Sequence, residues 1–332
     1  FQFDKSRINA SSPVKSLSFI NIHEKENRWY LQLYAKYLVG ISDLSLSNIR
    51  NKISFISQFL QYLYGRSKKV TELDMQDIVD YLSVLDESDI KYSTFNRYVT
   101  HVHTFLQFLK MKNIEVLKFY PERFLKKGFP EHNERSVPEK TIAHLIKELP
   151  TFPEHLQLMY LILFCTGIRK SEVCTIKSGA FYSQGNESWM RIYQSKMRRE
   201  KVIPIPSILV ELVNDYEKKH GIKNGEYLFK NKNGGAFSGQ TFSNQMIREC
   251  KVRGIDCGDY IFRAHDYRHN LATSMYGNGV SIQGVRDYLG HSSENMTKQY
   301  IDFMPERIVS AEDKYFSKNQ SFKLKGVEDD ER

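Results

Sequence analysis

Apolar residues recur every three to four positions through residues 24–113, the spacing that gathers them on one face of an α-helix. The pattern predicts helices over residues 27–40, 45–65, 71–85 and 91–113. Thr71 is the expected N-cap of the third helix, and Ser93 or Thr94 that of the fourth. Four or five helices of this length predict a small all-α domain over residues 24–113, preceded by an N-terminal extension of residues 1–23.

The regular pattern stops after residue 113. Residues 114–137 are interrupted by Pro121, Gly128 and Pro130 and are rich in Lys and Arg. We interpret them as a basic linker between two domains.

The second domain is expected over residues 138–318, followed by a charged tail of residues 319–332. Helical patterns dominate it, including a strongly apolar helix that should stop at Gly167. Between Ser188 and Ile205 the alternation changes to that of an antiparallel hairpin around a polar turn. The predicted fold class is therefore mainly α with a small antiparallel β-sheet (α+β), and the last helix of this domain is amphipathic.

The net charge indicates which kind of partner the protein could bind. The chain has 332 residues with 48 Lys and Arg against 39 Asp and Glu, a formal net charge of +9, which suits a polyanionic partner but also an ordinary basic protein. No apolar run approaches the roughly 18 residues of a membrane span, and the N-terminal stretch does not resemble a secretion signal, so a cytoplasmic protein is expected. A first residue other than Met suggests a trimmed chain.

The four cysteines do not have the spacing of a zinc site. Cys165, Cys174, Cys250 and Cys257 lack a CxxC pair, and we expect buried free thiols. Carboxylates are scattered, so no metal site is expected either.

Short segments of the second domain carry residues suited to phosphate chemistry. Arg169 opens a helix after Gly167, and Glu172 follows on the same helical face, where it can orient the arginine. His265 and Arg268 share one face of a helix start, and His291 follows a helix that should end at Gly290. Tyr300 lies nine residues further on. Taken singly, each of these residues has an ordinary surface interpretation.

The order and spacing of TGIRKSEV, a hairpin with Lys196 in its turn, HDYR, LGH and a Tyr nine residues later resemble the tyrosine recombinase family. The resemblance is specific over residues 138–305 and looser over the N-terminal helices, which resemble the family's core-binding domain. It implies a catalytic set of Arg169, Lys196, His265, Arg268, His291 and Tyr300. Arg198, Arg199 and Lys201 crowd the same turn, but alignment to Pro204 favours Lys196.

The resemblance implies a DNA strand transferase without metal or cofactor. Two arginines can clamp the non-bridging oxygens of a phosphodiester, with His291 as a further donor. The phenol of Tyr300 would attack with His265 as base or hydrogen-bond partner, and Lys196 would protonate the departing 5′ oxygen. The product would be a 3′-phosphotyrosyl link that conserves the bond energy for rejoining.

The expected partner is double-stranded DNA with specific sites, held by a clamp of both domains. The candidate DNA contacts of the helical domain lie at one helix start, whose opposite face, including Val99 and Phe105, reads as core. All candidate DNA contacts are Lys91, Tyr92, Ser93, Asn96, Arg97, Arg198 and Arg199. The family further implies a homotetramer on synapsed DNA, accessory recombination proteins as optional partners, and a place on the bacterial nucleoid.

The C-terminal apolar stripe is a separate expectation. Ile308, Val309, Ala311, Tyr315 and Phe316 lie on one side of a charged helix that must be covered by its own domain or, as the family implies, by a neighbouring protomer.

Alternative functions are a type IB topoisomerase, a chromosome-dimer resolvase, a DNA-binding regulator and, least favoured, a metal nuclease. Integration, excision or transposition of a mobile element is the expected process.

Overall fold

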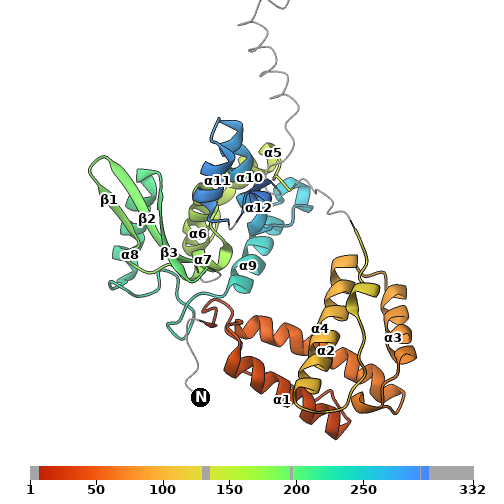
Figure 1. Ribbon diagram of the computed structural model, residues 1–332. Helices are drawn as coiled ribbons and strands as arrows, with labels where there is room; N and C mark the ends of the chain where they lie inside the picture. The colour runs from red at the N-terminus through yellow and green to blue at the C-terminus, as the bar shows by residue number, and fades with distance from the viewer. Residues whose placement is uncertain (1–6, 129–134, 195–196, 292, 299–332) are drawn as a thin grey trace, which may run out of the picture. The chain divides into compact units, whose positions relative to one another are not determined.

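The computed structural model describes residues 7–128, 135–194, 197–291 and 293–298 (Figure 1). They fall into two compact units: the first consists of residues 7–128 with the described part of 194–199, and the second of the remaining residues. Helices dominate both, and a single small antiparallel sheet accompanies them in the described part, which confirms the predicted fold class. No described helix is long and apolar enough to cross a membrane.

The N-terminal unit is a group of α-helices around an apolar core. Its described α-helices are α1 (Lys25–Ile41), α2 (Leu46–Gly65), α3 (Met75–Glu87) and α4 (Tyr92–Met111). Leu31, Ile56, Phe59 and Phe105 have no exposed surface. The face of α4 expected to be core is buried, including Val99 and Phe105. Helical periodicity therefore predicted both the elements and their inner faces.

Two helix starts differ from the predicted ones. Thr71 lies in a short 3-10 turn, η2 (Val70–Glu72), and α3 begins after Asp74. The Asp74 carboxylate accepts from the backbone N–H of Asp77, and the Asp77 carboxylate accepts from that of Asp74, both at 3.0 Å. This reciprocal cap satisfies two N–H groups, which Thr71 is too far upstream to do. Helix α4 begins at Tyr92 with no side-chain cap.

The segments on both sides of the four helices pack against them. Ile22, before α1, is 1% exposed, and Phe119, after α4, is 2% exposed. The side-chain amide of Asn96 bonds the backbone of Lys126 twice, donating to its carbonyl and accepting from its N–H, both at 2.9 Å. Residues 114–128, expected as linker, thus belong to the packing of this unit, with a short 3-10 turn η3 (Pro121–Arg123) among them.

Helix α6 lies in the middle of the C-terminal unit, and its side chains are buried or partly buried on every side. The described helices of this unit are α5 (Glu139–Glu148), α6 (Glu154–Thr166), α7 (Lys170–Cys174), α8 (Ser207–His220), α9 (Gly239–Val252), α10 (Ala264–Gly277), α11 (Ile282–Leu289) and α12 (Glu294–Lys298), with 3-10 turns η4 (Leu149–Thr151) and η5 (Ile255–Gly258). Leu156, Met159, Ile162 and Leu163 of α6 have no exposed surface. A helix that is apolar on all sides belongs in the middle of a domain.

The sheet has three strands in the order β1 (Phe181–Gln184), β2 (Glu187–Gln194) and β3 (Arg199–Pro204). Strands β2 and β3 are the predicted hairpin. Strand β1 pairs antiparallel with β2, with Phe181 opposite Met190, and was not predicted. Its four residues contain a single buried side chain, so its sequence has no usable alternation.

The cysteines are free, and their burial differs from the expectation at one position. Cys174 and Cys250 are buried and Cys165 partly buried, but Cys257 is exposed because it lies in the turn η5. Burial raises the pKa values of Cys174 and Cys250 to about 12. These two thiols are inert core groups at neutral pH.

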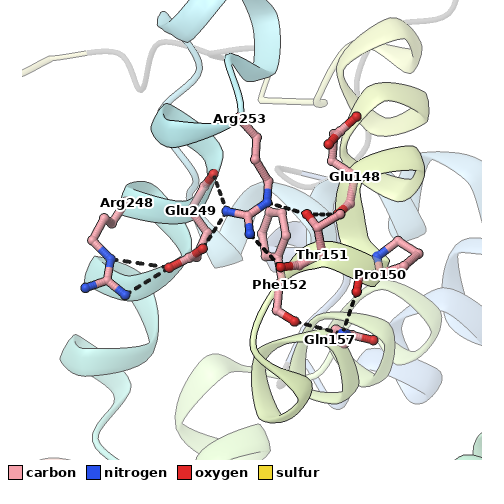
Figure 2. Close-up of polar contacts among 8 residues, drawn as sticks. All are labelled: Glu148, Pro150, Thr151, Phe152, Gln157, Arg248, Glu249 and Arg253. Atoms are coloured by element: carbon pink, nitrogen blue, oxygen red, sulfur yellow. Dashed lines mark hydrogen bonds and ion pairs between the residues drawn. The ribbon is translucent and has the colours of Figure 1, made fainter.

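Helix α9 is fastened to the turn between α5 and α6 by Arg253, as Figure 2 shows. The guanidinium bonds the Thr151 hydroxyl and carbonyl, forms an ion pair with Glu249 and stacks on the Phe152 ring at 4.6 Å. Gln157 donates to the carbonyl of Phe152 and holds the same turn from α6. This network fixes the position of α9, which supplies one wall of the hollow between α7 and α10.

Candidate active site

Arg268 joins three helices at the centre of the site. It lies on α10 and is 1% exposed. Its Nη1 donates to the carbonyl of Gly167 at 2.8 Å and its Nη2 to that of Leu289 at 2.5 Å. These carbonyls lie where α6 and α11 end, and each helix is closed by a left-handed glycine, Gly167 (φ 57°) and Gly290 (φ 68°). The buried guanidinium thus donates to carbonyls at the ends of two helices, where the helix dipole also favours positive charge.

Gly167 has a second reason to be glycine. A Cβ at this position would lie 2.8 Å from Cδ2 of Leu271. The left-handed turn and the close packing together allow α6 to stop and α7 to start within three residues. This places Arg169 directly beside the turn that Arg268 supports.

Arg169 is held by Glu172. The carboxylate accepts from the backbone N–H of Arg169 at 2.8 Å and from its Nη1 at 2.9 Å. The Glu172 side chain is 2% exposed and that of Arg169 is 20% exposed. A buried carboxylate therefore orients an arginine whose side chain still reaches the surface.

His265 lies in the first turn of α10, one turn before Arg268. Although its side chain reaches the surface, the packing around the ring lowers its pKa to about 4, and the positive charges of His269, Arg268, Arg135 and Arg169 lower it further. The ring is thus neutral at physiological pH and can accept a proton.

His269 was missed by the sequence analysis. It is 4% exposed and its ring meets that of His265 edge to face, with centroids 5.4 Å apart. Its place four residues after His265, on the same helical face, was the available signal.

His291 follows α11 and is 5% exposed. Its Nδ1 lies 3.0 Å from the hydroxyl of Thr297 on α12. Burial lowers its pKa to about 3, with further contributions from the charges of Arg268, Arg169, Lys201 and His265. The second imidazole of the site is therefore also neutral at pH 7.

Lys201 does not lie in the hairpin turn, where it was expected. It lies on β3, its Nζ donates to the carbonyl of Tyr288 on α11, and it lies 5.8 Å from the centre of the Tyr288 ring. Of the other hairpin residues, Arg198 lies in the turn with φ 52° and Arg199 begins β3. Lys196 and Tyr300 lie outside the described residues.

The structure brings Arg169, His265, Arg268 and His291 into one site. Each histidine experiences the charges of both arginines, and a hollow of about 390 Å³ is lined by Arg169, His265 and Arg268. Such a site favours an anion. Within the described ranges, no three His, Cys, Asp or Glu side chains gather as metal ligands would.

The candidate DNA contacts at the start of α4 divide into two kinds. Lys91, Ser93 and Arg97 are exposed. Asn96 is occupied by the backbone of Lys126, and the ring of Tyr92 is packed against Gly128, so a Cβ there would come within 2.5 Å of it. These latter two residues therefore secure the segment after α4 instead of facing outward.

Solved structures of similar fold include complexes of recombination enzymes with their target sites. A site-specific recombinase XerH bound to its difH substrate aligns with a TM-score of 0.64 and 16% identity, covering 93% of each chain. A λ integrase dimer bound to a core site aligns with a TM-score of 0.62 and 17% identity, covering 82% of this chain and 76% of the integrase.

Sequence relatives point the same way. Transposase B from transposon PsiTn554 of Staphylococcus aureus is 29% identical over 321 residues, 92% of this chain and 51% of the transposase. The chain thus spans about half the length of the transposases it matches first. Tyrosine recombinase XerA of Pyrococcus furiosus is 25% identical over 284 residues, 85% of this chain and 92% of that protein.

Family models match both units. Residues 31–113 match the phage integrase N-terminal SAM-like domain. Residues 135–307, which include every residue of the site, match the phage integrase family. The chain belongs to the phage integrase family.

Proposed function

We propose that this protein is a site-specific tyrosine recombinase, with residues 138–318 as its catalytic domain and residues 24–113, against which residues 114–128 pack, as a DNA-binding domain. The observation that carries the proposal is the gathering of Arg169, His265, Arg268 and His291 in one cationic site inside a phage integrase family domain. The site is built for an anion, and its two imidazoles are neutral at pH 7.

The proposed reaction follows from these groups. Arg169 and Arg268 bind the non-bridging oxygens of the scissile phosphate, and His291 donates to the same group. The Tyr300 hydroxyl gives its proton to His265 as its oxygen bonds phosphorus. The bond from phosphorus to the 5′ oxygen breaks, and Lys196 supplies the proton to that oxygen. Rejoining reverses these steps with a 5′-hydroxyl from another strand.

Covalent trapping tests this proposal. The duplex that the full chain recovers from a randomised pool serves as substrate, with a nick placed to prevent religation. The parent should form a protein–DNA adduct, and Tyr300→Phe should form none while binding the duplex with nearly unchanged affinity. Adduct formation by the Phe variant, or none by the parent on any selected duplex, would contradict the assignment.

The positive charge that metals supply in nucleases would come here from the arginine side chains, so we propose a reaction that needs neither metal nor other cofactor. Cleavage should persist in excess EDTA. Loss of cleavage on chelation, restored by Mg²⁺, points instead to a nuclease.

We propose that the process served is movement of a mobile element, because a transposase encoded by a transposon is 29% identical over 92% of this chain. Chromosome-dimer resolution is the second candidate, supported by the similarity to XerA, and a type IB topoisomerase activity is a third. Exchange between two selected sites on separate plasmids indicates a recombinase. Relaxation of a single supercoiled plasmid without exchange indicates the topoisomerase.

The proposed assembly is a homotetramer on two synapsed duplexes in the bacterial cytoplasm, on the nucleoid, with accessory recombination proteins as further partners. A λ integrase tetramer bound to a Holliday junction has a similar fold, with 17% identity and a TM-score of 0.62. The apolar C-terminal stripe from Ile308 to Phe316, which lies outside the described residues, would dock into a neighbouring protomer. Removing residues 307–332 should then leave single-site binding intact and impair synapsis.

A further inference from the structure

The hollow beside the candidate active site has a second cationic wall that the proposed chemistry does not use. Arg169, His265 and Arg268 line one part of it, and Lys170, Arg263 and Ser243 line another. Apolar residues, among them Ile168, Ile247 and Phe262, also line it. Such surface lowers the local dielectric and strengthens the attraction of the cations for an anion.

Lys170 is held in position without being neutralised. It is the first residue of α7, and its aliphatic stem lies over Gly239 at the start of α9, about 3.8 Å from where a Cβ would stand. Its Nζ donates to the hydroxyl of Ser243 at 3.1 Å. A hydroxyl orients an ammonium group but carries no charge to balance it, and an ammonium can donate three hydrogen bonds.

Arg263 approaches the hollow from α10. It is exposed and occupies the N-cap position of this 14-residue helix, which has no side-chain cap. The first-turn N–H groups of a helix favour an anion, and here the guanidinium adds a full charge beside them. Across the described parts of the chain, neither Arg263 nor Lys170 has a carboxylate within ion-pair distance.

The proposed reaction places only one phosphate at Arg169 and Arg268, whereas a DNA strand carries a phosphate at every nucleotide. We propose that Lys170 and Arg263 bind a phosphate of the cleaved strand next to the scissile one, and that Ser243 positions the Lys170 ammonium for this contact. The inference rests on the proposed function. The contact with Lys170 and Arg263 would determine which phosphate along the strand lies against the catalytic arginines.

Methylphosphonate substitution tests the contact directly, because it removes the charge of one chosen phosphate. The probe is the duplex that the full chain recovers from a randomised pool, with the cut position mapped from the covalent adduct. Single methylphosphonates are placed at each of the positions flanking the cut, and the dissociation constant and the rate of adduct formation are measured for each duplex.

The variants separate charge from packing. Lys170→Met keeps most of the stem over Gly239 and removes the ammonium, and Lys170→Arg keeps the charge. Arg263→Gln removes the second cation. Ser243→Ala leaves Lys170 in place without its hydroxyl partner. Lys232→Met, in an exposed turn, is the matched control for loss of one surface lysine.

The expected result is a specific loss of additivity. Lys170→Met should weaken binding of the unmodified duplex about tenfold. At one flanking position, the methylphosphonate should weaken binding by the parent by a similar factor. The same methylphosphonate should not change binding by the Lys170→Met variant. Arg263→Gln should likewise make binding insensitive to a methylphosphonate at the same position. Lys170→Arg should bind as tightly as the parent. Ser243→Ala should lose less affinity than Lys170→Met. The salt dependence of binding should fall by about 0.9 in slope for the lost contact. Lys232→Met should change none of these.

Two outcomes overturn the inference in distinguishable ways. If the parent forms adduct and the Lys170 and phosphate effects are additive at every position, this contact is wrong and the proposed function stands. If the parent forms no adduct, the proposed function fails and the inference fails with it.

Discussion

The Glu172 carboxylate accepts two hydrogen bonds from Arg169, one from its backbone N–H at 2.8 Å and one from its guanidinium at 2.9 Å. One buried group thus fixes both the start of α7 and the direction of the arginine. The arginine that the proposed chemistry needs at the phosphate therefore depends on a carboxylate that would never touch DNA.

Replacing Glu172 with Ala should lower the rate of covalent adduct formation by about 100-fold, because Arg169 is no longer held where it would bind the phosphate. DNA affinity should change much less, since other cations remain. Single-turnover trapping with a saturating duplex measures the rate. Glu172→Gln, which keeps an acceptor for the backbone N–H, should lose less. Equal rates for the parent and both variants would mean that Glu172 does not position Arg169.

Arg268 should behave differently from Arg169 because it is buried and bonded to two carbonyls. Arg268→Gln should lower the free energy of unfolding of the C-terminal unit by about 2–5 kcal/mol, since both carbonyls lose a charged donor. Arg169→Gln, whose side chain is 20% exposed, should abolish cleavage with a smaller loss of stability. Urea unfolding and adduct assays on the two variants separate these effects. A stable Arg268→Gln protein would contradict the structural role.

His265 should titrate far below an ordinary histidine. Its pKa is lowered from 6.5 to about 4, first by burial and then by neighbouring positive charge. The unfolded chain therefore takes up the proton first as the pH falls, and the contribution of this residue to stability is lost between about pH 6.5 and pH 4. In the folded protein the ring should remain a proton acceptor down to about pH 4. NMR titration of the ring, compared with the chain in urea, measures both values, and a folded-state midpoint near pH 6.5 would contradict the structure.

Glu249 also loses its contribution to stability on acidification, but at a lower pH and for a different reason. Burial alone would raise its pKa, but the hydrogen bonds from Arg248 and Arg253 outweigh burial and the pKa is lowered. Its contribution to stability should be present above about pH 4.5 and should be lost as the pH falls through the lowered value. Glu249→Gln should cost about 1–3 kcal/mol at pH 7 and reduce the loss of stability on acidification. Urea unfolding at pH 4, 5 and 7 tests this, with Glu226→Gln, which removes the half-exposed partner of Lys230, as control.

The sequence predicted the helices, and it named four residues that the structure brings together, but it did not predict the contacts around them. Apolar periodicity located α1 to α4, and Gly167 marked the end of α6 correctly because a left-handed residue is needed there. Strand β1 was missed because four residues with one buried side chain carry no pattern. Asp74 was missed as a cap because the alternative at Thr71 fitted the same helical spacing.

Long-range contacts account for the rest. Nothing in HDYR indicates that Arg268 is fully buried, since its partners Gly167 and Leu289 are 101 and 21 residues away in sequence. Lys201 was assigned to the hairpin turn, but its contact with Tyr288 arises only when β3 lies beside α11. Local patterns name elements and residue types, whereas burial and partners depend on how those elements pack.

Asn96 and Arg97 are neighbours on α4 with different expected roles. The Asn96 amide bonds the backbone N–H and carbonyl of Lys126, while Arg97 is exposed. Near Arg97, burial lowers the pKa of His101 to about 4, and the positive charges of Lys52 and Arg97 contribute further to this shift.

Asn96→Ala should therefore lower the stability of the N-terminal unit by about 1–3 kcal/mol, because two backbone groups lose their partners. Arg97→Ala should change stability by less than about 0.5 kcal/mol, but should weaken binding of the selected duplex and lower the salt slope by about 1. Urea unfolding and binding at several salt concentrations compare the two variants directly. If Arg97→Ala binds as tightly as the parent at every salt concentration, α4 does not present this residue to DNA. If Asn96→Ala weakens binding without loss of stability, its amide acts on DNA and not on the segment after α4.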